Sequence, residues 1–237
     1  MRVYRKRNRD AVMRDAIKQL NVILKEVRRR PLLLMLSGGS ALELLAGINM
    51  QNIGRHVTLA VLDERYHTDP AVNNFSQVSA TEFYRRAEKR GVDYIDTRVK
   101  PSDTLKRFAA RFDKRLHTWK KQNPKGIVIA IQGIGPDGHT AGIMPYPENP
   151  RKFKRLFDDE HVWAVGYNAT RIKTDYPFRV TVTLPFLREK IDKSLVYATG
   201  ANKQKALGRV FASRGLLSRT PARIIYEMKD ARMFTDQ

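Results

Sequence analysis

Three short apolar runs, each followed at once by a polar or glycine-rich segment, most restrict what this chain can fold into. They lie in LLLML at 32–36, VTLAVLDE at 57–64 and IVIAIQGIG at 127–135. Continuous apolar runs of this length are typical of strands that are buried on both faces of a sheet. The pattern therefore predicts buried strands that deliver hydroxyls, charges and glycines to the ends where they stop.

Helical patterns separate these strands along the chain. Apolar residues recur at three- and four-residue steps from Val12 to Val27, which predicts a helix that ends at Pro31. Further helices are expected at 41–48 (ALELLAGI), 73–90, 101–121 with Ser102 or Asp103 as N-cap, and 203–213. Later strands are expected at 162–166, 179–184 and 194–199, and the basic N-terminus is interpreted as the lead-in to the first helix.

Strands that alternate with helices predict an α/β fold with a mostly parallel sheet covered by helices on both faces. The chain has 237 residues and shows no linker, internal repeat or low-complexity segment, so one domain over 1–237 is expected. No apolar stretch approaches the roughly 18–20 residues of a membrane span, and the N-terminus lacks the apolar core of a secretory signal. We expect a cytoplasmic protein without a membrane contact.

Composition excludes several kinds of chemistry. The chain has no cysteine, which rules out disulfides, thiolate catalysis and thiolate metal sites. No two of its five histidines have the spacing that places two metal ligands on one helix face, so neither a metal nor another cofactor is predicted.

The formal net charge of the chain is +21, which attracts anions. Because the basic residues are scattered and form no nucleic-acid-binding motif, phosphorylated metabolites are favoured over nucleic acid as partners.

Two of the segments at strand ends contain residues suited to an anionic ligand. Ser37, Gly38, Gly39 and Ser40 form a turn between a strand and a helix, where free amides can bind a phosphate, although such a turn can also serve packing alone. In 63–65, Asp63 and Arg65 share one side if the strand stays extended. They could bind a sugar hydroxyl and a phosphate, or form an ordinary ion pair. Asn74 follows in a turn, where an N-cap role is the commonest use.

The third segment, GIGPDGHT at 133–140, carries the strongest indication of catalysis. Its three glycines and one proline restrict the backbone path, which ends at His139 with the carboxylate of Asp137 two residues away. A histidine is suited to general-base catalysis near neutral pH, and a carboxylate can orient its ring. Further along the chain, Arg179 and Lys203 are cations at strand ends that could contact a phosphate.

Taken in order over nearly the whole chain, these motifs resemble the superfamily of 6-phosphogluconolactonases and glucosamine-6-phosphate deaminases. The motifs are LSGGS at 36–40, LDER at 62–65, the asparagine turn at 73–74, GIGPDGHTA at 133–141, FRVTVTL at 178–184 and ATGANK at 198–203. The resemblance implies a modified doubly wound, Rossmann-like domain. It also implies a site made of His139 and Asp137 for catalysis and Ser37, Gly38, Gly39, Ser40, Asp63, Arg65, Asn74, Arg179 and Lys203 for the phosphosugar, with Lys173 as a further candidate.

The loop after His139 favours the lactonase branch. The deaminases have a Phe-Asn-Glu-Pro-Gly stretch there, whereas this chain continues TAGIMP and has Met144, which cannot transfer protons, five residues after the histidine. The lactonase pattern, Asp-Gly-His-Thr-Ala-Ser-Leu-Phe-Pro, is closer. The resemblance thus implies hydrolysis of 6-phosphogluconolactone, a pentose phosphate pathway step, by water that His139 activates without a metal. A deaminase or isomerase and a non-catalytic sugar-phosphate or nucleic-acid-binding regulator remain the alternatives, and the oxyanion donor and oligomeric state stay open.

Overall fold

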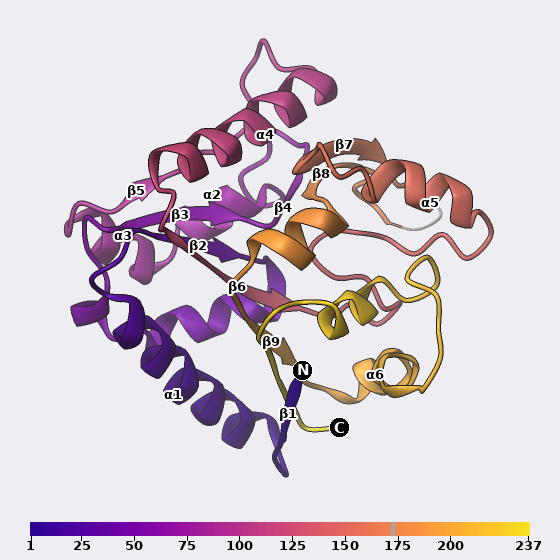
Figure 1. The fold of residues 1–237 in the computed structure, drawn as a ribbon, viewed down its shortest axis with the longest axis horizontal. Helices are drawn as coiled ribbons and strands as arrows, with labels where there is room; N and C mark the ends of the chain where they lie inside the picture. Colours follow the sequence, from indigo (N-terminus) through magenta and orange to yellow (C-terminus); the bar gives the residue numbers. More distant parts are fainter. Residues whose placement is uncertain (172–173) are drawn as a thin grey trace.

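Two β-sheets organise the chain in the computed structural model, which describes residues 1–171 and 174–237 (Figure 1). The strands of the larger sheet are β1 (Arg2–Arg5), β2 (Leu32–Leu36), β3 (Val57–Val61), β5 (Asp93–Tyr94), β6 (Ile127–Gly133), β9 (Lys193–Ala198) and β10 (Ala231–Thr235). They are all parallel and lie in the order β1-β10-β9-β6-β2-β3-β5. The predicted α/β fold with a mostly parallel sheet is confirmed.

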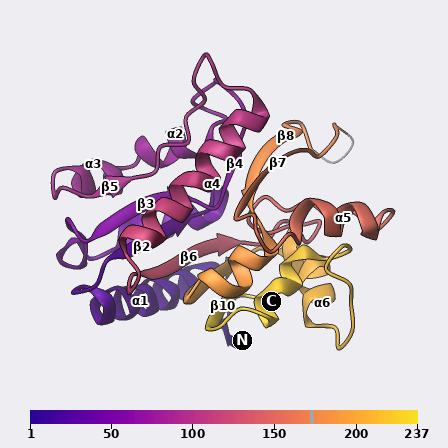
Figure 2. The same ribbon diagram turned by 45° about the horizontal axis from the view of Figure 1, so that its top comes forward.

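Alternate side chains of the central strands enter two hydrophobic cores, one on each face of the larger sheet. Leu34 of β2 packs in the core that contains helix α1 (Arg9–Val27), whereas its neighbour Leu33 packs in the core that contains helix α4 (Leu105–Gln122). Figure 2 shows these two helices on opposite sides of β2, β3 and β6. Burial on both faces explains why β2 is an uninterrupted apolar run, and it confirms the predicted helical cover.

A second, antiparallel sheet packs against the first and was not expected. Its strands, in spatial order, are β4 (Asp63–Arg65), β8 (Phe178–Val182) and β7 (Ala164–Asn168). The expectation that 57–64 form one strand is therefore wrong, whereas the strands expected at 162–166 and 179–184 are present as β7 and β8 of this second sheet. The chain changes sheets at Leu62, whose N–H donates to the Leu36 carbonyl (2.9 Å) while its carbonyl accepts from Val182 (3.0 Å).

The helix predicted at 73–90 is in fact two helices, α2 (Asn74–Ser79) and α3 (Glu82–Glu88). Thr81 separates them because its hydroxyl accepts the Tyr84 amide and begins a new helix.

Other helices also differ from the prediction in detail. The helix at 41–48 is observed as the 3₁₀ helix η1 (Gly39–Gly47), and the helix at 203–213 as α6 (Gln204–Phe211). Thr104, and not Ser102 or Asp103, is the N-cap of α4. None of the helices in the described residues is long and apolar enough to cross a bilayer.

The N-terminal residues form an edge strand instead of a helix lead-in. β1 pairs with β10, and the ring of Tyr4 stacks on that of Phe234 at a centroid distance of 4.8 Å. None of the four residues of β1 is fully buried, so the strand lacks the apolar run by which the buried strands are recognised. β5, β10 and helix α5 (Pro150–Phe157) were likewise not predicted.

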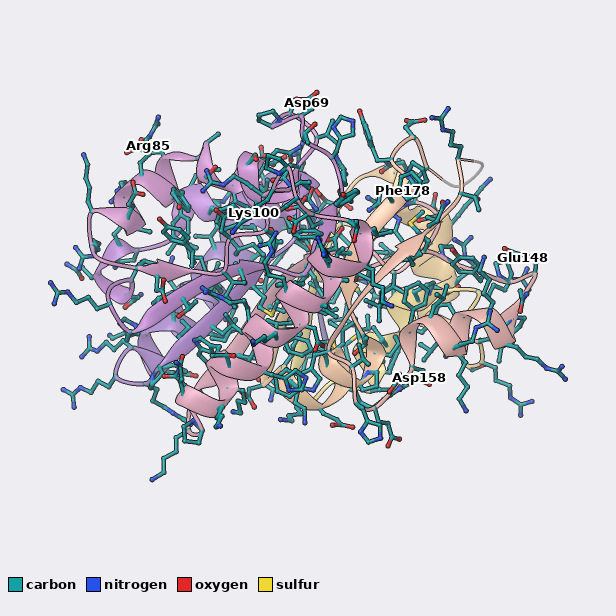
Figure 3. The ribbon with its side chains drawn as sticks, turned by 90° about the horizontal axis from the view of Figure 1, so that it is seen from above. Asp69, Arg85, Lys100, Glu148, Asp158 and Phe178 are labelled. Carbon is teal, nitrogen blue, oxygen red and sulfur yellow. The ribbon has the colours of Figure 1, made fainter. Side chains whose placement is uncertain are left out.

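Charged side chains point outward around the whole outline of the molecule (Figure 3). Arg85 lies at one end and Glu148 at the other. Basic residues lie in the last turn of α4 (Lys120 and Lys121) and in the last turn of α5, and these two helices are in different parts of the fold. The excess positive charge is thus spread over several elements.

The crevice that could hold a ligand lies at the carboxyl ends of β2 and β6. These strands are neighbours in the sheet, but the chain leaves them toward opposite faces. After β2, Leu44 of η1 packs in the core on the α1 side, and after β6, Ile143 packs in the core on the α4 side. Such a divergence of neighbouring connections is where parallel α/β sheets bind ligands.

Candidate active site

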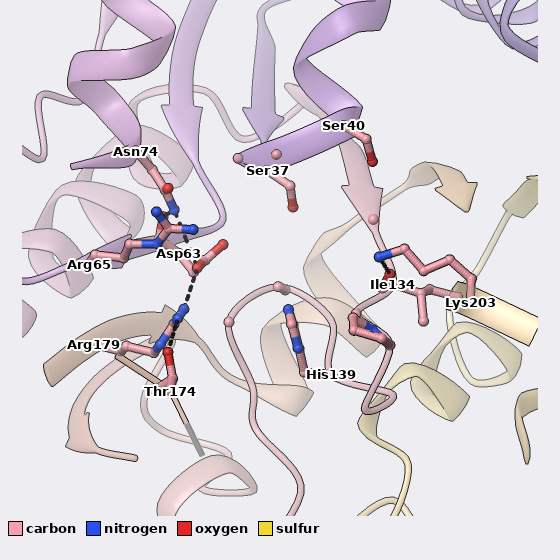
Figure 4. A pocket seen from close by; sticks show the side chains of 17 residues that line it. Ser37, Ser40, Asp63, Arg65, Asn74, Ile134, His139, Thr174, Arg179 and Lys203 are labelled. Carbon is pink, nitrogen blue, oxygen red and sulfur yellow. Dashed lines mark hydrogen bonds and ion pairs between the residues drawn. The ribbon is translucent and has the colours of Figure 1, made fainter. Parts of the chain in front are cut away.

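A pocket of about 310 Å³ lies in this crevice (Figure 4). Among the described residues, every site residue that the sequence predicted lines it except Asp137, whose carboxylate contacts the His139 ring. The lining residues among them are Ser37, Gly38, Gly39, Ser40, Asp63, Arg65, Asn74, His139, Arg179 and Lys203. Thr174, Ala141 and Gly142 line the pocket as well and had no assigned role. Lys173 lies outside the described residues.

His139 and Asp137 form a hydrogen-bonded pair. Nδ1 of His139 lies 2.6 Å from Oδ1 of Asp137, which also accepts the His139 backbone amide at 3.0 Å. A carboxylate at Nδ1 favours the tautomer with the proton on that nitrogen, which leaves Nε2 as an acceptor. The ring points into the pocket (Figure 4). This arrangement suits a general base.

The electrostatics of the pair favour an ionised carboxylate. Burial works to raise the pKa of Asp137, but the hydrogen bond and the charge of the His139 ring outweigh it, so the pKa lies below its ordinary value. Asp137 therefore carries a negative charge at neutral pH. A fixed negative charge beside Nδ1 stabilises the imidazolium that forms when Nε2 takes a proton.

The glycines of this loop allow the backbone to pass directly behind the imidazole. A Cβ atom on Gly135 would lie 2.1 Å from Nδ1 of His139, so no side chain fits there. The Gly135 amide donates to the His139 carbonyl (2.8 Å) and closes the loop. Gly138 has a φ of +92°, which glycine adopts far more readily than other residues. The glycine pattern therefore positions the histidine.

One face of the small sheet forms a second wall of the pocket. Asp63 is paired with Thr181 across the β4–β8 ladder, and Arg65 with Arg179. Because directly paired residues share a face and side chains alternate along a strand, all four side chains lie on one face. The sequence expectation that Asp63 and Arg65 share a side holds because β4 is extended.

The polar groups of this wall contact one another only loosely. Nη1 of Arg179 lies 3.5 Å from Oδ2 of Asp63, and Nη2 contacts the Thr174 hydroxyl at 3.2 Å. The Nε atoms of Arg179 and Arg65 are buried and have no hydrogen-bond partner within the described residues. The two guanidinium groups thus keep donor capacity for a bound anion.

Asn74 connects this wall to the glycine turn. Its Nδ2 donates to the Asp63 carbonyl (3.0 Å), and a Cβ atom on Gly38 would lie 2.6 Å from its Oδ1. The neighbouring Asn73 is the N-cap of α2, where its side chain accepts the Ser76 amide at 2.8 Å. Of the two asparagines, Asn73 is therefore structural and Asn74 faces the pocket.

Glu64 lies on the other face of β4 and has a structural role. It is fully buried, and its two oxygens accept the amides of Arg65, Asn74 and Phe75 and the hydroxyl of Thr97 at 2.5–3.0 Å. Burial raises its pKa, whereas the hydrogen bonds from Phe75, Asn74 and Thr97 work to lower it. The carboxyl group holds the start of α2, and with it Asn74, against the end of β4.

Replacing Glu64 with glutamine is expected to lower the free energy of unfolding by about 1–3 kcal/mol. The new NH₂ group would face a backbone amide and leave a buried donor unpaired. Chemical denaturation measures the loss, and Glu88→Gln, an exposed site on α3, is the control that should change stability by less than about 0.5 kcal/mol. Equal stability of the two variants would contradict this role.

Ser40 and Lys203 lie on the opposite side of the pocket from the two arginines, with His139 between them (Figure 4). Nζ of Lys203 donates to the Ile134 carbonyl at 2.6 Å. Burial lowers the pKa of Lys203, and the negative charge of Asp137 opposes this effect. The three predicted cations therefore line the pocket from two sides.

Comparison with known proteins adds a family and a fold. The family described as glucosamine-6-phosphate isomerases/6-phosphogluconolactonase matches residues 7–234. The 6-phosphogluconolactonases of Nostoc sp. and Synechocystis sp. are 32% identical over 107 residues and 31% over 110, which is 44% and 46% of this chain but only 39% and 40% of those proteins. The structure of 6-phosphogluconolactonase from Trypanosoma cruzi superposes with a TM-score of 0.75 at 20% identity, covering 99% of this chain and 93% of that one. That likeness is one of fold.

Proposed function

The chain belongs to the glucosamine-6-phosphate isomerase/6-phosphogluconolactonase family, and on this premise we propose that it hydrolyses 6-phosphoglucono-1,5-lactone to 6-phosphogluconate. The observation that carries the proposal is the His139 ring, whose Nδ1 is held by Asp137 and whose Nε2 faces a small cationic pocket. The curated relatives named above as 6-phosphogluconolactonases support this branch of the family.

The walls of the pocket suit a phosphorylated sugar. In this proposal the 6-phosphate of the substrate binds against the turn of Ser37–Ser40. Lys203 lies on one side of it, and Arg65 and Arg179 lie on the other. Guanidinium groups bind phosphate oxygens in two-point fashion, and lysine adds a point charge. The volume of about 310 Å³ lies at the lower end of small-molecule sites, which fits a single sugar phosphate.

The mechanism is general-base attack by water on the lactone. Nε2 of His139 takes a proton from a water molecule, whose oxygen bonds to C1 while the carbonyl electron pair moves to the carbonyl oxygen. When this tetrahedral intermediate collapses, the bond from C1 to the ring oxygen breaks, and the ring oxygen takes the proton from Nε2. The histidine returns to its starting state, and the new carboxylic acid ionises. Asp137 orients the ring and stabilises its charged form throughout.

Met144 argues against the deaminase branch. It stands five residues after His139, and its thioether has no proton to transfer. The side chain is buried in the hydrophobic core on the α4 side. Glu148, the next acid along the chain, lies at the outer edge of the molecule and does not line the pocket (Figure 3). The site thus offers His139, oriented by Asp137, for proton transfer, and no acid of the loop between His139 and α5 lines the pocket.

Parallel assays with the two family substrates test the function. With 6-phosphogluconolactone, the purified chain is expected to accelerate acid release well above the spontaneous rate. With glucosamine 6-phosphate, it is expected to release no ammonia above a blank. Ammonia release without lactone hydrolysis would reject the proposal in favour of the deaminase, and neither activity would reject both.

A further inference from the structure

The two residues at the tip of the turn after His139 have an unusual backbone conformation. Thr140 and Ile143 form a bridge in which the Ile143 amide donates to the Thr140 carbonyl at 2.8 Å. Between them, Ala141 has a φ of +48° and Gly142 a φ of +72°, as in a turn of type I′. Alanine rarely adopts positive φ, so the surrounding structure must hold the turn in this state.

Two buried hydroxyl groups of the small sheet hold it. The Thr181 hydroxyl donates to the Ala141 carbonyl, and the Tyr167 hydroxyl donates to the Gly142 carbonyl. Both donors are almost inaccessible to water. Because each hydroxyl binds a different carbonyl, together they fix the orientation of both peptide planes.

This orientation turns the Gly142 amide away from the small sheet. In a trans peptide the N–H points opposite to the carbonyl, so the N–H of Gly142 points away from Thr181. Ala141 and Gly142 line the same pocket as His139. Among the hydrogen bonds made by residues 1–171 and 174–237, none uses the amide of either turn residue.

We propose that the backbone amide of Gly142, with that of Ala141 beside it, binds the oxyanion that forms when water adds to the lactone carbonyl. The inference rests on the proposed hydrolysis. The amide keeps its proton and donates a hydrogen bond to the oxygen that receives the carbonyl electron pair. Thr181 and Tyr167 are then positioning residues, because they act through the turn.

The surroundings of Gly142 are compatible with this role. A Cβ atom on Gly142 would lie 2.4 Å from Cβ of Asp63, so the acid packs against the turn where a side chain would otherwise stand. The carboxylate of Asp63 faces the guanidinium of Arg179, which offsets its charge. A donor fixed in place before the reaction stabilises developing charge without reorganisation, and its loss typically costs 10²–10³ in kcat.

Replacing the peptide N–H by an ester oxygen tests the amide directly. Gly142→glycolic acid, introduced by in vitro translation, removes the donor and adds no side chain. We expect kcat for lactone hydrolysis to fall by about 10²–10³, with KM and the Kd for 6-phosphogluconate within threefold. The same exchange at Gly91, which has a φ of +74° and lies outside the pocket, is the control and should leave kcat unchanged.

A second pair of variants tests the positioning residues. Thr181→Val removes the hydroxyl that binds the Ala141 carbonyl and should lower kcat at least tenfold. Thr183→Val is the matched control, because that hydroxyl is equally buried on the same stretch of chain but donates to the Val162 carbonyl at 2.6 Å. Thr183→Val should lower the free energy of unfolding without lowering kcat.

The outcomes separate this inference from the proposed function. If the unchanged chain hydrolyses the lactone and the Gly142 ester retains kcat within threefold, the oxyanion assignment is wrong and the function stands. If Thr181→Val and Thr183→Val lower kcat equally, the positioning role is wrong. If the unchanged chain does not hydrolyse the lactone, the function is rejected, and the oxyanion assignment with it.

Discussion

Lactone hydrolysis by a His139→Ala variant is expected to be about 10²–10⁴-fold slower in kcat than by the unchanged chain at pH 7. The ring is the one imidazole that lines the pocket among the described residues, and its Nδ1 is occupied by Asp137. Alanine leaves the pocket and its cations in place but removes the acceptor for the water proton. General-base catalysis is typically worth this range of rate.

The measurement must subtract the spontaneous opening of the lactone, which proceeds without the protein. His161→Ala is a suitable control because His161 is exposed and does not line the pocket, so its kcat should match that of the unchanged chain. Binding of 6-phosphogluconate by His139→Ala shows whether the pocket is intact. A variant that binds normally and retains a rate within tenfold would mean that another group activates the water.

The positions of the candidate site residues could be predicted because they follow strands that are buried on both faces. Such strands are uninterrupted apolar runs, and β2, β3 and β6 were recognised for that reason. Polar residues directly after neighbouring parallel strands must meet at one edge of the sheet. Ser37, Asp63 and His139 do lie around one pocket.

The second sheet could not be predicted by the same reasoning. Leu62 continues the apolar run of β3, and only its hydrogen bonds to Leu36 and Val182 show that the chain changes sheets there. One signal was present in the sequence, because Arg179 and Thr181 alternate with valines. Such alternation is typical of an antiparallel strand with one polar face, and it does not fit a parallel strand with two buried faces.

The hydroxyls that hold the turn after His139 also lay beyond prediction. Tyr167 and Thr181 contact carbonyls that are 25 and 40 residues away in the sequence. Nothing in their own neighbourhood indicates that contact, because it depends on how the small sheet packs against the loop after β6. The sequence could locate the candidate catalytic histidine but not the groups that orient the backbone around it.

Gly135→Ala is expected to lower kcat at least 100-fold although it changes no group that reacts. The added Cβ would lie 2.1 Å from Nδ1 and Cε1 of the His139 ring and 2.7 Å from Oδ1 of Asp137. Contacts this short cannot exist, so the ring, the carboxylate or both must move. A general base must lie within hydrogen-bond distance of the water it activates, and displacement by about 1 Å can cost 10²-fold in rate.

Gly208→Ala is the control for this variant, because it adds the same methyl group at a helix position that has open space beside it. Its kcat should equal that of the unchanged chain. A ¹H–¹⁵N spectrum of the histidine rings separates loss of the pair from loss of the fold, since only the His139 signals should shift in Gly135→Ala. Full activity would mean that the loop can move aside without displacing the imidazole, and that the glycine serves packing alone.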